Sequence, residues 1–432
     1  MLLLGFLVLM LAGVPVALAM IVASLAYVML SGTVPDFVVI HRMYGGIDSF
    51  PLLAVPFFIL AGNLMNSAGI TNRIYNFALA LVGWLKGGLG HVNIVGSMIF
   101  AGMSGTAIAD AAGLGTIEIK AMQDHGYPLD FSVGVTAASA TLGPIIPPSL
   151  PFVIYGMMAG VSIGQLFLAG VIPGIVMGVF MMATVTWYAH RRDYGRDATF
   201  SWSALARTGA DAFLAMMTPV ILLGGMTFGV FTPTEGAIIA SAYALVLGLA
   251  WYRTLNLRML AKISMDTIET TATVLFIVAA ASIFGWLLTV TRVTDAVAVW
   301  VLSFTHAPWV FLLLANVLML VVGCFLEPVA AITLLVPILV PICQKLGIDL
   351  VHFGLVMVLN LMIGLLHPPL GTVLFVLSRT AKLSVERTTM AILPWLVPLF
   401  AALIVCTYIP EIVLWLPKHS AAMTEAVGGF FK

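Results

Sequence analysis

Long apolar runs separated by short polar connectors fill most of the chain. The runs, such as residues 213–230, are unbroken and do not alternate in polarity, which predicts helices and not the strands of a barrel. A helix needs about 20 apolar residues to cross a bilayer, so the 432 residues have room for roughly ten to twelve crossings. Residues 1–30 contain no Lys or Arg, and we expect them to form the first span. The pattern predicts an all-α polytopic membrane protein.

Two of the apolar runs are interrupted in the same way. Residues 102–148 begin with GMSGT and residues 323–369 begin with GCFLEP, and both stretches end on a double proline. One offset of 221 residues relates them. Residues that are identical at this offset include Gly102 and Gly323, Gln123 and Gln344, Gly126 and Gly347, Leu129 and Leu350, Gly143 and Gly364, and Pro147-Pro148 and Pro368-Pro369. The chain is therefore predicted to consist of two related halves.

Each half is predicted to hold a re-entrant helical hairpin and a broken transmembrane helix. Glycines and hydroxyls in the middle of an apolar run suit a hairpin tip that lies in protein or in a water-filled cavity. Proline removes a backbone donor and clashes with the preceding turn, so each double proline breaks a helix. We assign the first repeat to residues 1–207, with a hairpin near 94–122 and a broken helix near 131–160, and the second to residues 208–432, with a hairpin near 310–343 and a broken helix near 352–380.

Basic residues set the predicted orientation. Arg191, Arg192, Arg196 and Arg207 lie in the most basic connector, which is expected on the cytoplasmic side of the membrane. The basic connector at 253–262 follows one pair of crossings later and falls on the same side. An odd number of crossings in each half then gives two repeats of inverted topology, the plan of secondary transporters.

Composition agrees with this interpretation. The chain is 62% hydrophobic and 8% charged, whereas a soluble domain has about 25% charged residues. Its net charge is zero and it has no basic tract, so nucleic acid is not an expected partner. The three cysteines lie in apolar runs without a CxxC motif, and we interpret them as buried thiols.

The helix breaks carry the predicted chemistry. A break exposes carbonyl groups at one half-helix end, which suit a small hard cation, and amide groups at the other, which suit a carboxylate. The alternative is that the glycines and prolines only permit kinks and close packing. We predict a first cation site from Gly102, Ser104, Gly105, Gly143 and Pro144, a second from Gly323, Glu327, Gly364, His367 and Gly371, and a substrate site from Ser149, Thr372, Thr106 and Asp110.

Polar residues inside apolar runs have competing interpretations. Asp110 and Glu327 are functional candidates because a carboxylate inside a membrane is costly, but either could lie at the wet mouth of a hairpin. His367 suits a proton sensor or a hydrogen-bonded core histidine. Asn63 and Asn66 are expected to face protein or water, with a packing role as plausible as a functional one. A solvated turn is the interpretation of Glu118, Lys120, Asp124 and His125.

At these motifs the sequence resembles the large membrane subunit (DctM-like) of tripartite ATP-independent periplasmic transporters. The matching segments span both halves and read PFFILAGNLMNSAGIT, GSMIFAGMSGTAIADAAGLGTI, GPIIPPSLPFVIYG, GVFTPTEGAIIASAYAL, and GLLHPPLGTVLFV followed by AKLS. The resemblance implies an elevator-type importer of organic acids, such as C4-dicarboxylates or sialic acid, driven by sodium ions. It also implies a small membrane subunit, a periplasmic substrate-binding protein and a place in the bacterial inner membrane.

The sequence departs from the family pattern at two positions. Glu327 stands where the family commonly has Asp, which keeps the charge and lengthens its reach. His367 precedes Pro368-Pro369 where the family commonly has Thr, so only its carbonyl group is proposed as a cation ligand.

Two other function classes fit parts of the sequence. An intramembrane serine hydrolase would use Ser104 in a GxSG pattern, with a histidine elsewhere as its base, although the matching position of the second half has no serine. A channel would also need polar interruptions at mid-membrane. Two broken helices in inverted halves favour alternating access over either alternative.

Overall fold

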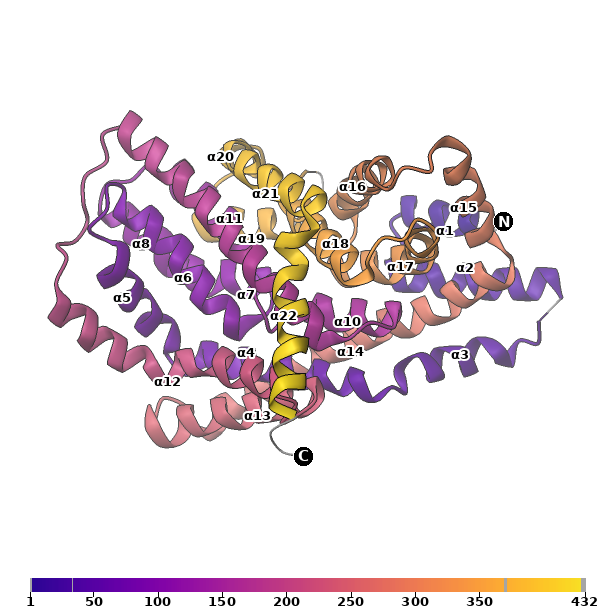
Figure 1. The fold of residues 1–432 in the computed structure, drawn as a ribbon, viewed down its shortest axis with the longest axis horizontal. Helices are drawn as coiled ribbons and strands as arrows, with labels where there is room; N and C mark the ends of the chain where they lie inside the picture. The colour runs from indigo at the N-terminus through magenta and orange to yellow at the C-terminus, as the bar shows by residue number, and fades with distance from the viewer. Residues whose placement is uncertain (1, 33, 369–370, 429–432) are drawn as a thin grey trace.

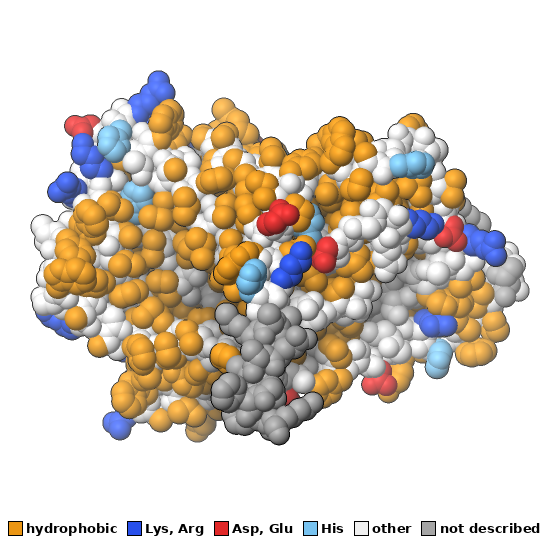
Figure 2. Space-filling view, in the orientation of Figure 1, with side chains coloured by type: hydrophobic (Ala, Val, Ile, Leu, Met, Phe, Trp, Pro, Cys, Tyr) orange, Lys and Arg blue, Asp and Glu red, His pale blue; other side chains and the backbone are white. Residues whose placement is uncertain are grey.

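The described chain folds into helices joined by short connectors. The computed structural model describes residues 2–32, 34–368 and 371–428; the side chains of Ser104 and of residues 421–428 lie outside that description. Within it, eight helices are long and apolar enough to cross a membrane. Figure 2 shows a face that is largely hydrophobic, with scattered charged side chains. Such an apolar exterior suits lipid as the surrounding solvent.

The N-terminal run forms two helices instead of the expected single span. Helix α1 (Leu2–Leu11) and α2 (Val16–Ser31) pack against each other as a hairpin. Gly13 between them has a φ of 84°, which is in the left-handed region, and Pro15 cannot extend the preceding helix. The prediction of one continuous span was therefore wrong, because the hydropathy of an apolar run does not reveal a short turn within it.

A group of helices around the long α14 forms one side of the molecule (Figure 1). It contains α3 (Phe37–Ile47), α4 (Ala54–Ser67), α13 (Pro233–Val246) and the long α14 (Leu257–Val290), with η1 (Phe50–Leu53) and η2 (Leu247–Trp251) at helix ends. Helix α14 packs against α2, α3 and α4, and α13 packs along α4. Of the helices that flank this group, α5 (Ile70–Val82) and α12 (Trp202–Thr227) pack against each other, and α15 (Val293–Phe304) packs against α14 and α17.

The first interrupted run forms a hairpin and then a broken helix. Its elements are α6 (Gly88–Ser104), α7 (Ala107–Ala112), α8 (Leu114–Asp124), α9 (Leu129–Ala140) and α10 (Leu150–Ala159). Gly105 turns the chain between α6 and α7 with a φ of 63°. A Cβ atom there would lie 2.8 Å from the carbonyl oxygen of Pro148, so only glycine lets the hairpin tip meet the helix break.

The second interrupted run has the same kind of elements. They are α16 (Pro308–Phe325), α17 (Pro328–Lys345), α18 (Leu350–Gly364) and α19 (Thr372–Ala381). Helix α17 continues through two internal prolines, Pro337 and Pro341. The chain continues with α20 (Val385–Ile392), η3 (Leu393–Trp395), α21 (Leu396–Tyr408) and α22 (Pro410–Gly428). Helices α21 and α22 lie with α11 (Ile163–Arg191) beside α18, whereas α20 and η3 pack against α9.

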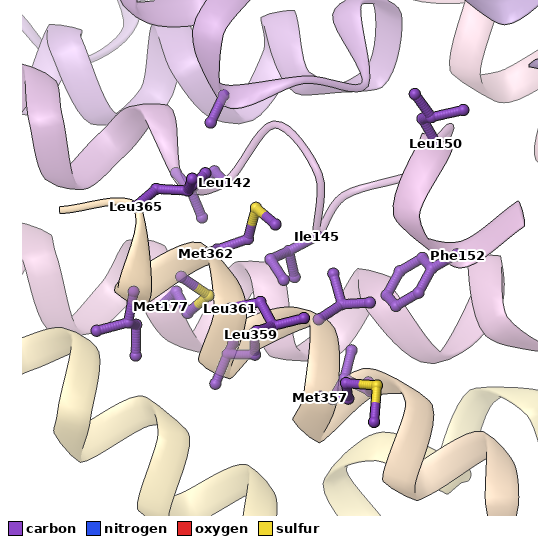
Figure 3. Packing of buried hydrophobic residues seen from close by; sticks show 14 of the residues in the cluster. Leu142, Ile145, Leu150, Phe152, Met177, Met357, Leu359, Leu361, Met362 and Leu365 are labelled. Carbon is purple, nitrogen blue, oxygen red and sulfur yellow. The ribbon is translucent and has the colours of Figure 1, made fainter. Parts of the chain in front are cut away.

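The two broken helices meet in the core. Figure 3 shows Leu142 and Ile145 from the first break near Leu361 and Met362 of α18 and Leu365 directly after it. All five side chains are buried. Helix α10 packs against α17 of the second hairpin, and α19 packs against α7 of the first. Each half of the chain thus places the end of its broken helix against the hairpin of the other half.

The cysteines are free thiols. Cys343 and Cys406 are buried as predicted, whereas Cys324 is only half-buried. None of the three forms a disulfide.

Candidate functional site

A cavity with a volume of about 490 Å³ lies where the interrupted segments meet. Residues from α4 and α14 line one part of it, and the two hairpin tips, the first break, the end of α18 and the start of α19 line the rest. The cavity therefore brings together residues more than 200 positions apart, such as Thr106 and Glu327. Its volume suits a small organic molecule.

Several helices begin at this cavity. Leu150 at the start of α10, Pro328 at the start of α17 and Thr372 at the start of α19 all line it, as do the first residues of the short α7. The first turn of a helix has unpaired backbone N–H groups and the positive end of the helix dipole. The arrangement therefore favours a negatively charged ligand without any cationic side chain, and the described lining residues include no Lys or Arg.

The polar lining comes from both sides of the cavity. Asn63 and Asn66 of α4 and Thr270 of α14 line the cavity from the group of helices around α14. The Nδ2 of Asn63 donates to Thr267 Oγ1 at 3.1 Å, and Asn66 Oδ1 accepts from Thr71 Oγ1 at 3.3 Å. These amides thus support the helix packing and line the cavity together, so the two interpretations of their role do not exclude each other.

Glu327 is the one charged side chain among the described lining residues. It is the N-cap residue of α17, and its side chain is exposed to the cavity. An ionised carboxylate there would repel the carboxylate of a substrate held nearby. A cation next to Glu327 would remove that repulsion.

The residues of the first predicted cation site lie at and behind the cavity wall. Gly105 and Pro144 line the cavity. Gly143 lies one layer behind, where a Cβ atom would be 3.0 Å from the carbonyl oxygen of Thr106. Gly102 packs against Pro219 of α12 instead, at 2.9 Å from its would-be Cβ atom. The side chain of Ser104 lies outside the description, so its predicted role stays a prediction.

The second predicted site is built on close backbone contacts. A Cβ atom on Gly364 would lie 2.8 Å from the Cα atom of Gly323, so α16 and α18 touch through bare backbone. The N–H of Gly371 donates to the carbonyl oxygen of His367 at 3.1 Å. The Nδ1 of His367 is 3.2 Å from the Ile363 carbonyl oxygen, and its ring packs on Phe400, so a hydrogen-bonded histidine describes it better than an open proton sensor.

No three His, Cys, Asp or Glu side chains come together as a metal site in the described chain. A cation at either junction would therefore be bound mainly by backbone carbonyl and hydroxyl oxygens. Such ligands suit a hard cation and not a transition metal.

The four predicted substrate residues separate into two pairs. Thr106 and Thr372 line the cavity. Thr106 Oγ1 caps α7 by accepting from the Ala109 N–H at 3.3 Å, whereas the buried Oγ1 of Thr372 has no partner among the described residues. Ser149 is fully buried, caps α10 and donates to the Pro144 carbonyl oxygen. Its hydroxyl therefore holds the break together and does not face the cavity.

Asp110 also lies away from the cavity. It is 1% exposed and accepts a hydrogen bond from Ser97 Oγ at 3.3 Å. The prediction of a wet hairpin mouth does not describe it, and neither does direct contact with a substrate in the cavity. Local sequence could not distinguish these positions, because the direction in which α7 faces depends on how it packs against α6 and α19.

Glu118 corrects a further prediction. The sequence suggested a solvated turn, and Lys120, Asp124 and His125 are indeed exposed. Glu118 is instead 1% exposed, because it lies on the face of α8 that packs against α6 and α9. Glu118 comes four residues after the buried Leu114, so both lie on the same face of α8, and this spacing could have predicted the burial of Glu118.

Comparisons with known proteins agree over almost the whole chain. The family model described as "Tripartite ATP-independent periplasmic transporter, DctM component" matches residues 3–412. The sialic acid TRAP transporter large permease protein SiaM of Vibrio cholerae is 46% identical over 414 residues, which cover 96% of this chain and 97% of that protein. The isethionate TRAP transporter permease protein DctMQ of Oleidesulfovibrio alaskensis is 38% identical, over 94% of this chain and 64% of its own.

A solved structure shares the fold. The YdaH transporter of Alcanivorax borkumensis matches with a TM-score of 0.63 and 16% sequence identity, covering 87% of this chain and 88% of that one. At this sequence identity the match shows only that the two proteins share their arrangement of helices.

Proposed function

The chain belongs to the family of the DctM component of tripartite ATP-independent periplasmic transporters, and from that premise we propose that it imports an organic acid by sodium symport. Membership makes it a large permease subunit, a transporter and not an enzyme, so the serine-hydrolase alternative falls. The relatives described above are named for sialic acid and for isethionate, which are both organic anions. A C4-dicarboxylate or a sugar acid is the corresponding substrate class for this chain.

The observation that carries the proposal is the cavity at which helix N-termini and one carboxylate meet. The amide groups at the starts of α10 and α19 would hold the carboxylate of the substrate, with the hydroxyl groups of Thr106 and Thr372 beside them. Asn63, Asn66 and Thr270 would contact the rest of the molecule from the opposite wall.

Sodium ions would bind at the two hairpin–break junctions. The first site would use carbonyl groups around Gly105 and Pro144, and the second would use Glu327 with carbonyl groups around Gly364 and His367. A sodium ion beside Glu327 cancels the repulsion of an organic anion, so each ligand raises the affinity of the other. This coupling is reciprocal, as symport requires.

The proposed transport cycle rests on two inverted repeats. Helix α6 ends at Ser104 and α16 at Phe325, and α8 ends at Asp124 and α17 at Lys345, so both pairs of ends are 221 residues apart. The packing is also reciprocal: α10 of the first half packs on α17 of the second, and α19 of the second half packs on α7 of the first. In the elevator scheme that we propose, the hairpins and broken helices move as one body against α3, α4, α13 and α14.

Two further proteins would complete the transporter. The DctMQ relative, of which this chain covers 64%, supports a small membrane subunit as a partner here. A periplasmic binding protein would deliver the substrate, which places the complex in the bacterial inner membrane. This chain supplies the multi-pass part, with eight helices able to span a bilayer within the described residues.

Uptake into proteoliposomes tests the proposal. The complex of this chain and its small subunit would be reconstituted, with the binding protein outside and labelled organic acids supplied with or without an inward sodium gradient. We expect uptake only with both sodium and the binding protein. Uptake driven by a proton gradient and indifferent to sodium would refute the sodium sites, and no uptake of any organic acid under either gradient would refute the substrate class.

A hydroxyl deletion locates the substrate. Thr372→Val keeps the shape of the side chain and removes the unpartnered Oγ1, so KM for the organic acid should rise about tenfold or more, as expected for a lost hydrogen bond to a charged group. The matched control is Thr389→Val on α20, whose hydroxyl donates to the Val385 carbonyl oxygen outside the cavity. Equal KM values for the two variants would contradict the placement of the substrate.

A further inference from the structure

Two buried carboxyl groups lie behind the cavity wall. Asp110 of α7 and Glu118 of α8 are each 1% exposed and do not line the cavity. Asp110 Oδ1 accepts the Ser97 hydroxyl, but its Oδ2 has no hydrogen-bond partner among the described residues. Both carboxyl oxygens of Glu118 also lack a described partner.

Both groups face the same stretch of α6. Ser97 contacts Asp110, and its neighbour Gly96 faces Glu118, where a Cβ atom would be 3.0 Å from Oε1. The two carboxyl groups therefore lie against consecutive residues of α6. Glycine at position 96 leaves the room that the Glu118 side chain occupies.

The polar groups nearby are already paired with one another. Asn93 Nδ2 donates to Thr136 Oγ1 at 2.7 Å, and Ser139 Oγ donates to Asn93 Oδ1 at 2.6 Å. This α6–α9 network is satisfied internally and leaves no donor directed at Glu118 among its described hydrogen bonds.

Among the described residues, no cationic side chain neutralises the two carboxyl groups. The helices packed against α7 and α8 are α5, α6, α9 and α19. Among their titratable groups, Tyr75 of α5 is a phenol and supplies no positive charge. The others are engaged or exposed: Arg73 pairs with Asp211, His91 lies 3.4 Å from Thr186, Asp130 pairs with Arg387, and Arg379 is exposed.

Two neighbouring carboxylates without a counter-ion cannot both remain ionised in such a place. Burying one unpaired charge is costly, and a second charge of the same sign adds repulsion. A proton removes one charge and also turns a carboxyl oxygen into a donor, which can satisfy an orphaned acceptor. Carboxyl pairs that share one proton are a known solution to this problem.

We propose that Asp110 and Glu118 form a proton-binding site that is separate from the cavity and holds one proton near neutral pH. The site lies in the first hairpin, between the tip that lines the cavity and the turn after α8. Loss of the proton would place two like charges between α6 and α8 and loosen their packing. The hairpin is thereby sensitive to protons independently of sodium and substrate.

Infrared spectroscopy tests the proposal on the complex with its small subunit in lipid nanodiscs. A protonated buried carboxyl group gives a carbonyl stretching band that carboxylates lack, and the band shifts in D₂O. We expect this band near neutral pH in the wild type, and its loss or shift in Glu118→Gln and in Asp110→Asn. Glu386→Gln, an exposed residue in the first turn of α20, is the matched control and should keep the band.

Each outcome decides the proposal. Both amide variants imitate the protonated state, so both should fold. If one of them does not fold, the other is sufficient for the test. A wild type without the band, or a band that persists in both variants, overturns the proton site. A band that disappears when sodium is added at constant pH would show a metal cation in place of the proton, and would overturn it too. None of these results depends on which organic acid is transported.

Discussion

The contact between Gly323 and Gly364 joins the second hairpin to its broken helix through backbone alone. A Cβ atom on Gly364 would lie 2.8 Å from both the Cα and the carbonyl carbon of Gly323. Carbon atoms pack at roughly 3.5–4.0 Å, so Gly364→Ala requires α16 and α18 to separate by roughly 0.7–1.2 Å. Neither side of the contact is a flexible side chain. We expect a loss of about 1–3 kcal/mol in the free energy of unfolding.

The reciprocal substitution should be milder. A Cβ atom on Gly323 would meet the Cα of Gly364 and the Cδ2 of Leu361, both at 3.3 Å. The side chain of Leu361 can rotate, so Gly323→Ala should cost about 1 kcal/mol or less. Gly224→Ala on α12 is the control, since no atom lies within 4 Å of the added methyl group. Alanine there should stabilise the helix by up to about 1 kcal/mol.

Reversible denaturation in mixed micelles would measure the three free energies of unfolding. The same variants would be assayed for the sodium concentration that gives half-maximal uptake, which should rise most for Gly364→Ala because this junction is a proposed sodium site. A Gly364→Ala protein as stable as the wild type would refute the reasoning. So would a larger loss in Gly323→Ala than in Gly364→Ala.

Two further substitutions test buried polar contacts. Asn360 donates to the carbonyl oxygen and the Oδ1 of Asn316, at 3.0 Å and 2.8 Å, so Asn360→Ala should lower the free energy of unfolding by about 0.6–2 kcal/mol; no change in the same micelle assay would contradict this. Burial and a 2.6 Å hydrogen bond to Asp197 raise the pKa of Tyr127, which lies in the connector after α8. The neutral phenol is therefore the form that stabilises the fold, and stability should fall as pH rises beyond about 10, the ordinary value for tyrosine. Tyr127→Phe should show a smaller fall, which thermal unfolding across that pH range would measure.

Much of the helical plan could be predicted from the sequence. The first break lies at the predicted double proline, with α9 ending at Ala140 and α10 beginning at Leu150. Proline and glycine act on the chain within one or two residues, so their effect does not depend on distant contacts. The exception was the N-terminal run, where Gly13 and Pro15 divide one apolar stretch into two helices.

The candidate site was only partly predictable. Among the predicted residues, Gly105, Thr106, Pro144, Glu327 and Thr372 line the cavity. Ser149 and Asp110 face other parts of the protein, and Glu118 proved to be buried. The direction of a side chain depends on how its helix is rotated against its neighbours, and neighbours such as α7 and α19 are distant in sequence.

The sequence by itself determined a multi-pass helical membrane protein with two interrupted segments, because hydropathy and chain-breaking residues act locally. Only the tertiary structure decided that the hairpin tips, the first break and the start of α19 enclose one cavity with α4 and α14. It also decided that Asp110 and Glu118 are buried together behind that cavity. The physical reason is that the cavity arises from packing between segments more than 200 residues apart, and that the burial of the two carboxyl groups arises from the packing of α7 and α8 against α6, α9 and α19, which no local pattern of the chain records.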